Sequence, residues 1–246
     1  QVILAEKLAK ISGLGKCFFC NSGAEANETA FKLARKITGK TKIIAMEHAF
    51  HGRTFAALAA TWKSKYKKPF EPLVPGFTHV PYNNVDAVQE AIDLNTAAVI
   101  VEPIQGEAGI IIPDKGYLAG LKKICEEQKI LLIADEVQTS LRTGKFFAYQ
   151  NENIKPDIIT LAKGIANGVP IGICIANKGL DFDKGNHAST FGGNSLACAA
   201  ANATIDFILK KKLVENAEKI GNYLIKKLNE LKDKKPVIKE VRGKGL

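Results

Sequence analysis

The sequence predicts an α/β fold in which a mostly parallel sheet carries helices on both faces. Segments with helical periodicity alternate with short apolar runs along most of the chain, the order that builds parallel sheets. The run Ile130–Ala134 is continuously apolar, as expected of a strand that helices cover on both sides. With 246 residues, 46% of them hydrophobic, the chain has enough material for such a core.

The first part of the chain is expected to alternate helix and strand. The pattern predicts helices at residues 1–13, Ala24–Ile37 and Thr54–Thr61, and strands at Cys17–Cys20 and Lys42–Met46. Glu25 and Glu28 occupy the first turns of the second helix, where the helix dipole favours negative charge. Several prolines then predict an extended loop over residues 63–83.

The alternation becomes regular after this loop. Helices are expected at Val85–Leu94 and Gly116–Gln128, and strands at Ala97–Glu102, Ile130–Asp135, Asp157–Leu161 and Ile171–Ala176. Residues 210–239 carry ten lysines and four acids, a net charge of +6, with apolar residues at helical spacing. We interpret this stretch as an amphipathic helix with a solvated basic face rather than as a nucleic-acid site.

The composition is that of a globular protein and excludes disordered, collagen-like and disulfide-stapled chains. The charge of +10 comes from 35 basic and 25 acidic residues, and only four of the basic residues are arginines. No apolar run is long enough for a membrane span, and charged residues interrupt the N-terminal apolar stretch, so neither a membrane anchor nor a signal peptide is expected. An odd number of scattered cysteines, five in all, favours reduced thiols and a cytoplasmic location.

The sequence offers two partial metal-binding patterns, and neither is complete. Cys17 and Cys20 form a C-x-x-C pair, but no second pair accompanies it, and a strand would place them on opposite faces. His48 and His51 have no third ligand beside them, so we interpret them as hydrogen-bonding residues. No metal site is expected.

Polar groups stand at the ends of several predicted strands, where α/β sheets bind ligands. Residues Asn21–Ala24 open a helix and could cradle an anion, although the same residues also fit a plain helix N-cap. Asp135 ends an apolar strand and Lys163 follows the next one, so the two could form a buried ion pair. Lysine in an apolar pocket can instead become an imine-forming nucleophile. Together with an anion cradle, the acid and the lysine match the needs of pyridoxal phosphate.

The sequence resembles the class III (subgroup II) pyridoxal-phosphate-dependent aminotransferases, and among them the acetylornithine aminotransferases most. Six blocks carry the resemblance in order: Asn21–Glu28, Phe50–Thr54, Glu102–Glu107, Ala134–Gln138, Leu161–Gly164 and Ser189–Asn194. The loop Phe70–Phe77 resembles that of acetylornithine and ornithine enzymes more than that of 4-aminobutyrate enzymes. The resemblance implies the large domain of a fold type I pyridoxal-phosphate-dependent transferase.

The resemblance implies how the cofactor is held. Lys163 is expected to bind the cofactor aldehyde covalently and then move the proton between the substrate Cα and C4′ of the cofactor. Asp135 is expected to keep the pyridine nitrogen protonated. The other expected cofactor contacts are Ser22, Gly23 and Ala24 at the phosphate, Phe50 and Val137 on the two ring faces, and Gln138 at the phenolic oxygen. Thr190 is expected to reach the phosphate bound by a neighbouring subunit, which implies a homodimer with shared active sites.

The resemblance also implies the substrate contacts. Arg53 is the expected clamp for the substrate α-carboxylate, a task suited to its two-pronged guanidinium. Ser189 is a further expected substrate contact. Glu107 is expected to pair with an arginine and control the binding of the two substrates in turn. The implied partners are a small-molecule amino donor and 2-oxoglutarate, with no nucleic acid and no membrane.

The expected reaction moves the terminal amino group of N2-acetylornithine to 2-oxoglutarate, a step of arginine biosynthesis, in a ping-pong cycle. Ornithine, succinylornithine and 4-aminobutyrate remain open as donors. Two further alternatives are a glutamate-1-semialdehyde aminomutase, which transfers no amino group to an oxo acid, and an inactive member of the fold that acts as a scaffold.

Two departures from the family pattern are visible. The loop over residues 138–144 is one residue shorter than is usual for the family. The family also has a segment before Gln1 and a C-terminal small domain that contributes a second carboxylate-binding arginine. We therefore expect residues 1–235 to form the cofactor-binding large domain and residues 236–246 to begin the small domain.

Overall fold

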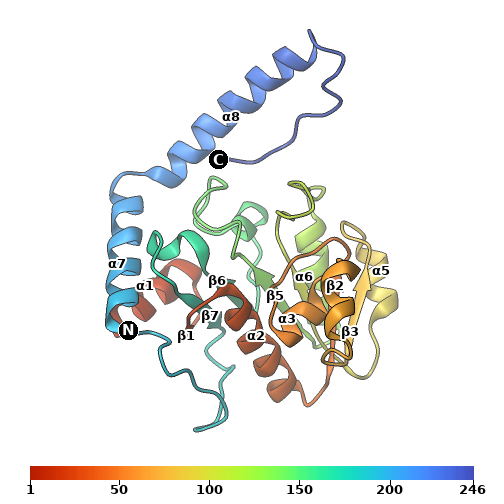
Figure 1. Ribbon diagram of the computed structural model, residues 1–246, viewed down its shortest axis with the longest axis vertical. Helices are drawn as coiled ribbons and strands as arrows, with labels where there is room; N and C mark the ends of the chain where they lie inside the picture. Colours follow the sequence, from red (N-terminus) through yellow and green to blue (C-terminus); the bar gives the residue numbers. More distant parts are fainter.

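A seven-stranded sheet lies at the centre of the molecule in the computed structural model, which describes all 246 residues (Figure 1). The strand order is β1-β7-β6-β5-β4-β2-β3. The strands are β1 (Lys16–Cys20), β2 (Lys42–Met46), β3 (Phe77–Val80), β4 (Thr96–Val101), β5 (Leu131–Asp135), β6 (Ile158–Leu161) and β7 (Gly172–Ala176). β7 alone runs opposite to the other six strands, so the predicted mostly parallel α/β fold is confirmed.

Helices cover both faces of this sheet. The first face carries α2 (Gly23–Thr38) and α3 (Phe55–Ala60), and the second carries α1 (Val2–Ser12), α5 (Val85–Ala91), α6 (Tyr117–Glu127) and α7 (Ser195–Lys210). Ile133 of β5 packs into the hydrophobic cluster of α2, whereas Leu132 packs into that of α1, α6 and α7. Two separate cores therefore explain why the strands are apolar without alternation.

Local sequence signals set both ends of α2, the helix that follows β1. Ser22 caps α2 by accepting a hydrogen bond from the Glu25 backbone N–H at 3.2 Å. Gly39 ends the helix at a φ of 68°, a left-handed conformation that glycine adopts without strain. The helix therefore begins directly where β1 ends, with its N-terminus at the sheet edge.

The extended loop expected over residues 63–83 is wrong at its start and near its end. It contains α4 (Ser64–Lys67), the 3₁₀ helix η1 (Lys68–Phe70) and strand β3, which pairs in parallel with β2 at the sheet edge. The prolines flank β3 without interrupting it, which is why an edge strand survives in a proline-rich segment. Two further 3₁₀ helices, η2 (Ala148–Glu152) and η3 (Lys163–Ala166), lie in the loops around β6.

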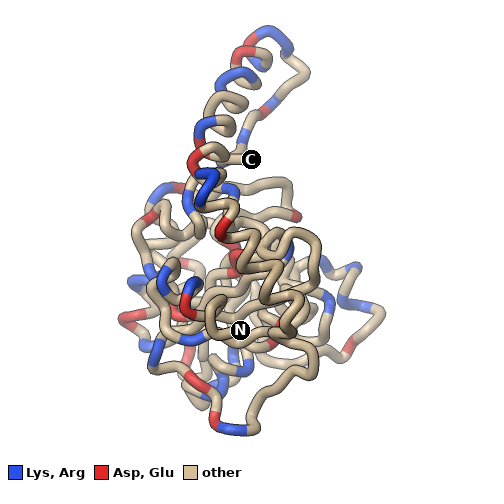
Figure 2. Tube along the Cα trace, turned by 90° about the vertical axis from the view of Figure 1, so that its left-hand side faces the viewer, with Lys and Arg blue, Asp and Glu red and all other residues tan.

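The basic segment contains one helix, α8, which is shorter than the stretch expected. Lys210 ends α7, Lys212 has a φ of 51°, and α8 (Leu213–Lys232) follows, so the helix expected over residues 210–239 is too long at both ends. The last helix projects from the body and residues 233–246 return beside it (Figure 1). Basic and acidic residues are interleaved along this arm (Figure 2). A domain boundary at residues 235–236 stays a prediction.

No helix of the structure combines the length and the apolar character that crossing a bilayer requires.

Candidate active site

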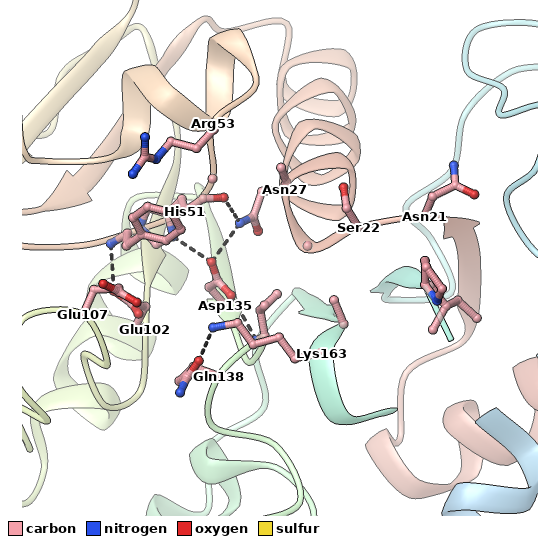
Figure 3. Close-up of a pocket in the computed structure, with 18 of the residues that line it drawn as sticks. Asn21, Ser22, Asn27, His51, Arg53, Glu102, Glu107, Asp135, Gln138 and Lys163 are labelled. Atoms are coloured by element: carbon pink, nitrogen blue, oxygen red, sulfur yellow. Dashed lines mark hydrogen bonds and ion pairs between the residues drawn. The ribbon is translucent and has the colours of Figure 1, made fainter. Parts of the chain in front are cut away.

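A cavity of about 450 Å³ opens at the sheet edge where the parallel strands end (Figure 3). Its walls come from the segments that follow β1, β2, β4, β5 and β6, and from the segment that precedes β7. Because β7 runs opposite to β6, its beginning lies at the same edge as the other strands' ends. Ten residues expected from the sequence line the cavity: Ser22, Gly23, Ala24, Phe50, Arg53, Glu107, Asp135, Val137, Gln138 and Lys163.

Asp135 ends β5 and is only 3% exposed. Its Oδ2 accepts hydrogen bonds from His51 Nδ1 at 2.7 Å and Asn27 Nδ2 at 2.8 Å, and its Oδ1 accepts one from the Val137 N–H at 3.0 Å. These donors compensate for the burial of a carboxylate. Since each carboxylate oxygen has two acceptor positions, Oδ1 keeps one for a donor inside the cavity.

Asn27 and His51 form the support of this carboxylate. The Asn27 amide also donates to the His51 carbonyl oxygen at 2.7 Å, so one side chain fixes both partners. His51 is buried and hydrogen-bonded, as expected, and donating to Asp135 requires its proton on Nδ1. The contribution of Asn27 was not foreseen from the sequence. Its position four residues after Gly23, on the same face of α2, was the available signal.

Lys163 begins η3 directly after β6, with a φ of 44°. Its ammonium donates a hydrogen bond to Gln138 Oε1 (Figure 3). Lys163 is exposed to the cavity and makes no ion pair with Asp135, whose partners are His51, Asn27 and Val137. The alternative of a structural Asp135–Lys163 ion pair is therefore wrong, and Lys163 is not tied to an acid.

The N-terminus of α2 borders the cavity through Ser22, Gly23 and Ala24. A Cβ on Gly23 would lie 2.8 Å from Val137 Cγ1, and one on Gly172 would lie 2.0 Å from the Ser22 carbonyl oxygen. Both glycines are thus required for the close approach of this turn to β7 and to Val137. The turn presents backbone N–H groups at the positive end of a helix dipole, which suits a phosphate.

Phe50 and Arg53 line one side of the cavity and Tyr66 packs against both; we call these three residues the mouth. The Arg53 guanidinium lies 3.7 Å from the centroid of the Tyr66 ring and 5.5 Å from that of Phe50. Glu107 lines the cavity and has no ion pair within this chain, so its expected arginine partner stays a prediction. Tyr66 was not foreseen, because it lies in the segment expected to be a loop.

Two further buried carboxylates lie near Asp135. Glu102 is 4% exposed and accepts hydrogen bonds from the backbone N–H groups of Phe50 at 3.1 Å and Gly106 at 3.4 Å. Burial is the main cause that raises the pKa of Glu102 to about 7, with His51 acting in the opposite direction. Burial likewise raises the pKa of Glu136 to about 7. Through its hydrogen bonds to the Phe50 and Gly106 N–H groups, Glu102 joins the loop that carries Phe50 to the loop that carries Glu107.

Ser189 and Thr190 do not line this cavity. They border a neighbouring cavity of about 360 Å³, which shares Asn21 with the first. Ser189 Oγ accepts hydrogen bonds from Asn21 Nδ2 at 3.3 Å and from the Gly192 N–H at 3.0 Å. Their expected contacts with substrate and with a neighbouring subunit's phosphate stay predictions.

The lining residues fit pyridoxal phosphate. The N-terminus of α2 can hold the phosphate. Asp135 has a free acceptor position for the pyridine N–H, and Lys163, which has no ion pair, can bind the aldehyde. Phe50 and Val137 add apolar wall for the ring. No group of three or more His, Cys, Asp or Glu side chains is arranged to hold a metal ion.

Comparison with protein families gives a match to aminotransferase class-III over residues 1–246. The acetylornithine aminotransferase of Methanopyrus kandleri is 54% identical over 247 aligned residues, which cover 99% of this chain and 62% of the relative. A putative [LysW]-aminoadipate semialdehyde/glutamate semialdehyde transaminase of Pyrococcus horikoshii is 53% identical over 87% of this chain and 58% of its own length. The chain thus spans about three-fifths of the length of these relatives.

Solved structures agree with the fold. The ornithine aminotransferase of Toxoplasma gondii, crystallised with partial occupancy of PLP at its active site, superposes with a TM-score of 0.96 at 37% identity. The match covers 100% of this chain and 61% of that one.

Proposed function

This chain belongs to the class-III aminotransferases, and on that basis we propose that it is the cofactor-binding part of a pyridoxal-phosphate-dependent enzyme. The proposed reaction transfers the terminal amino group of N2-acetylornithine to 2-oxoglutarate, as a step of arginine biosynthesis. The acetylornithine aminotransferase that is 54% identical to this chain supports the choice of donor.

The observation that carries the proposal is the environment of Asp135. The Asp135 side chain is 3% exposed, accepts hydrogen bonds from Asn27, His51 and the Val137 backbone N–H, and makes no ion pair with a lysine or arginine. Such a carboxylate suits a pyridinium N–H, because the two then neutralise each other away from water. When bound, pyridoxal phosphate supplies an aldehyde and an electron-withdrawing ring that stabilises negative charge at the substrate Cα.

The chain's own residues would divide the remaining work. Lys163 holds and returns the proton at the substrate Cα, and Gln138 orients the Lys163 ammonium. Backbone N–H groups of Gly23 and Ala24, with the Ser22 turn, bind the phosphate. Phe50 and Val137 exclude water from the ring faces.

Arg53 and Glu107 would control the substrates. The Arg53 guanidinium is stacked on Tyr66 but makes no ion pair within the chain, so it remains available for a carboxylate. Glu107 lines the same cavity and would adjust the site to the donor and the acceptor in turn.

We also propose a cytoplasmic homodimer with shared active sites. Ser189 and Thr190 lie outside the cavity, next to Phe191, which is 72% exposed, and near Leu196, which is 71% exposed. Exposed apolar side chains of this size favour a protein interface. The five cysteines are all free, which fits a reducing compartment. Light scattering of the purified protein should give twice the monomer mass, and a monomer that retains full activity would contradict shared sites.

A visible absorption spectrum tests the function directly. The protein should show the band of a cofactor attached to a lysine, lose it with N2-acetylornithine and regain it with 2-oxoglutarate. If the band responds only to ornithine, succinylornithine or 4-aminobutyrate, that compound is the amino donor in place of N2-acetylornithine. Response only to a [LysW]-linked amine whose transamination yields the semialdehyde would favour the second group of relatives, which are nearly as similar.

The same spectrum separates the remaining alternatives. Isomerisation of glutamate-1-semialdehyde with no net transfer to 2-oxoglutarate would indicate an aminomutase. Absence of any band after addition of pyridoxal phosphate would contradict the enzyme proposal and favour a scaffold.

A further inference from the structure

Four lysines lie within six residues beside the mouth of the cavity. We call Lys63, Lys65, Lys67 and Lys68 the lysine collar; Lys63 is the N-cap of α4, and the others belong to α4 and η1. Tyr66 lies between them in the sequence and contacts the Arg53 guanidinium at 3.7 Å. Because Arg53 lines the cavity, this contact places the lysine collar beside that wall of the cavity.

Three cations gather around the ring of Tyr66. The ammonium groups of Lys63 and Lys65 lie 5.8 and 5.2 Å from the ring centroid, in addition to Arg53. None of the three has a hydrogen bond or ion pair to an acid, whereas elsewhere Lys7 and Lys42 pair with aspartates. Contact with the ring offsets only part of the repulsion between like charges. The three cations around Tyr66 therefore lack an acidic partner, a role that an anion could fill.

This charge extends from the surface towards the cavity. Lys65 and Lys68 are exposed, and Lys63 and Lys67 are half-buried. Burial lowers the pKa of Lys67, and the negative charge of Glu71 opposes that shift. Glu71 is the one acid in residues 63–71, so the segment keeps an excess of positive charge. A basic rim that leads to an arginine on the cavity wall concentrates anions where substrates enter.

We propose that the lysine collar is an outer binding site for small dicarboxylates, which speeds entry of the oxo-acid acceptor but not of the amino donor. This inference rests on the proposed transamination. N2-acetylornithine has one carboxylate and one terminal ammonium and therefore no net charge, whereas 2-oxoglutarate has two carboxylates. A positive field attracts the dianion strongly and the zwitterion weakly. The lysine collar thus acts on one half-reaction.

Half-reaction kinetics test this asymmetry. Replacing the four collar lysines by glutamine should lower kcat/KM for 2-oxoglutarate about tenfold or more at low salt, and change kcat/KM for N2-acetylornithine less than about twofold. The control variant replaces Lys219, Lys226, Lys234 and Lys235 by glutamine, which changes the net charge equally at exposed positions in and beyond α8. This control should retain both values. In the wild type, added salt should reduce kcat/KM for 2-oxoglutarate alone.

A binding measurement gives a readout that requires no cofactor. Trp62 is the only tryptophan and precedes Lys63 directly, so its fluorescence reports on the mouth. Succinate should change the emission saturably in the wild type and in the α8 control, but not in the collar variant, and propionate should bind more weakly. Equal kinetic losses in both half-reactions, an equal loss in the control, or no succinate response in the wild type would overturn the proposal. If the protein catalyses no transamination, the proposed function fails while the Trp62 titration still decides the anion site.

Discussion

The part of the cavity at Asp135, which we call the floor, and the mouth differ in how their charged groups are surrounded. At the floor, Asp135 is buried and its oxygens accept fixed hydrogen bonds from neighbouring side-chain and backbone groups, chiefly Asn27 and His51. At the mouth, Arg53 and the lysine collar carry positive charge without ion-pair partners around Tyr66. A desolvated charge with fixed partners acts strongly over short distances, whereas exposed charges act over longer distances and weaken with salt. The difference assigns chemistry to the floor and substrate entry to the mouth.

The largest effect should come from removing the reacting group above the floor. Lys163→Ala is expected to lower turnover by at least about 10³-fold, because no other residue can bind the cofactor aldehyde and move the Cα proton. The visible absorption spectrum should also lose the band of lysine-bound cofactor. Lys184→Ala, at an exposed position, serves as the control. Turnover within tenfold of the wild type in Lys163→Ala would remove this residue from the reaction.

Neutralising the floor should have the next largest effect. Asp135→Asn keeps the size of the side chain but loses the charge, and we expect kcat to fall about 10²-fold or more. Asn27→Ala leaves the charge but removes one of its donors, so a smaller loss, about tenfold, is expected. Steady-state kinetics with both substrates measures this order. A larger loss in Asn27→Ala than in Asp135→Asn would contradict the assigned roles.

Adding a Cβ beside the turn of Ser22, Gly23 and Ala24, the proposed phosphate site, should destabilise both the fold and the site. A Cβ at position 172 would lie 2.0 Å from the Ser22 carbonyl oxygen, so Gly172→Ala must shift β7 away from the turn. We expect a loss of about 1–3 kcal/mol in the free energy of unfolding and faster release of cofactor. Gly179→Ala, where a Cβ meets nothing within 4 Å, is the matched control. Equal stability of the two variants in urea would show that the turn is not tightly packed.

The buried acid Glu102 makes stability depend on pH. Its pKa is about 7 in the folded protein, against an ordinary value of 4.5, so the folded state holds this proton more tightly than the unfolded chain. The resulting stabilisation is fully present below pH 4.5 and is lost as the pH rises through about 7. Glu102→Gln remains neutral throughout. Between pH 5 and 8 the free energy of unfolding should therefore fall less in this variant than in the wild type, and the difference between the two falls should be about 1 kcal/mol or more.

Urea unfolding at the two pH values measures this difference. Glu90→Gln, an exposed residue of α5, should leave the pH dependence of the wild type unchanged. Glu136 shifts in the same direction, so some pH dependence should persist in Glu102→Gln. An unchanged slope in Glu102→Gln would mean that Glu102 is ionised in the folded protein at neutral pH.

The smallest effect is expected at the mouth. Lys63→Gln and Lys65→Gln should each change the free energy of unfolding by less than about 0.5 kcal/mol, because neither lysine has an acidic partner and each lies more than 5 Å from the centroid of the Tyr66 ring. Thermal unfolding measures this directly. A loss comparable to that of Gly172→Ala would show that the lysine collar is part of the packed structure.

The fold was predictable where burial dictates composition. Strands β2, β4, β5 and β6 agree with the sequence prediction to within a residue at each end, because they are apolar on both faces. Strand β3 was missed because its Phe77, Thr78 and His79 are only half-buried at the sheet edge and carry no apolar run. Helix α7 was missed too, since its alanine-rich sequence has little amphipathic contrast.

The site was predictable in its members more than in its geometry. Strand ends indicated Asp135 and Lys163, and the family resemblance supplied most of the other lining residues. The sequence could not show that Asp135 binds His51 and Asn27 rather than Lys163, because these contacts join three separate elements. It also could not show the reversed direction of β7, which depends on pairing between strands distant in the sequence.

The reversal of β7 limits where the chain can change its length. Lys163 leaves the sheet at the end of β6, and Gly172 re-enters it at the same edge to pack against Ser22. Residues 164–171 therefore form a tether with both ends fixed, and adding or deleting one residue would displace either the reactive amine or the anion-binding turn. Loops at the opposite edge of the sheet carry neither the reactive amine nor the anion-binding turn. Insertional mutagenesis should find sites tolerant of extra residues there and none between Lys163 and Gly172.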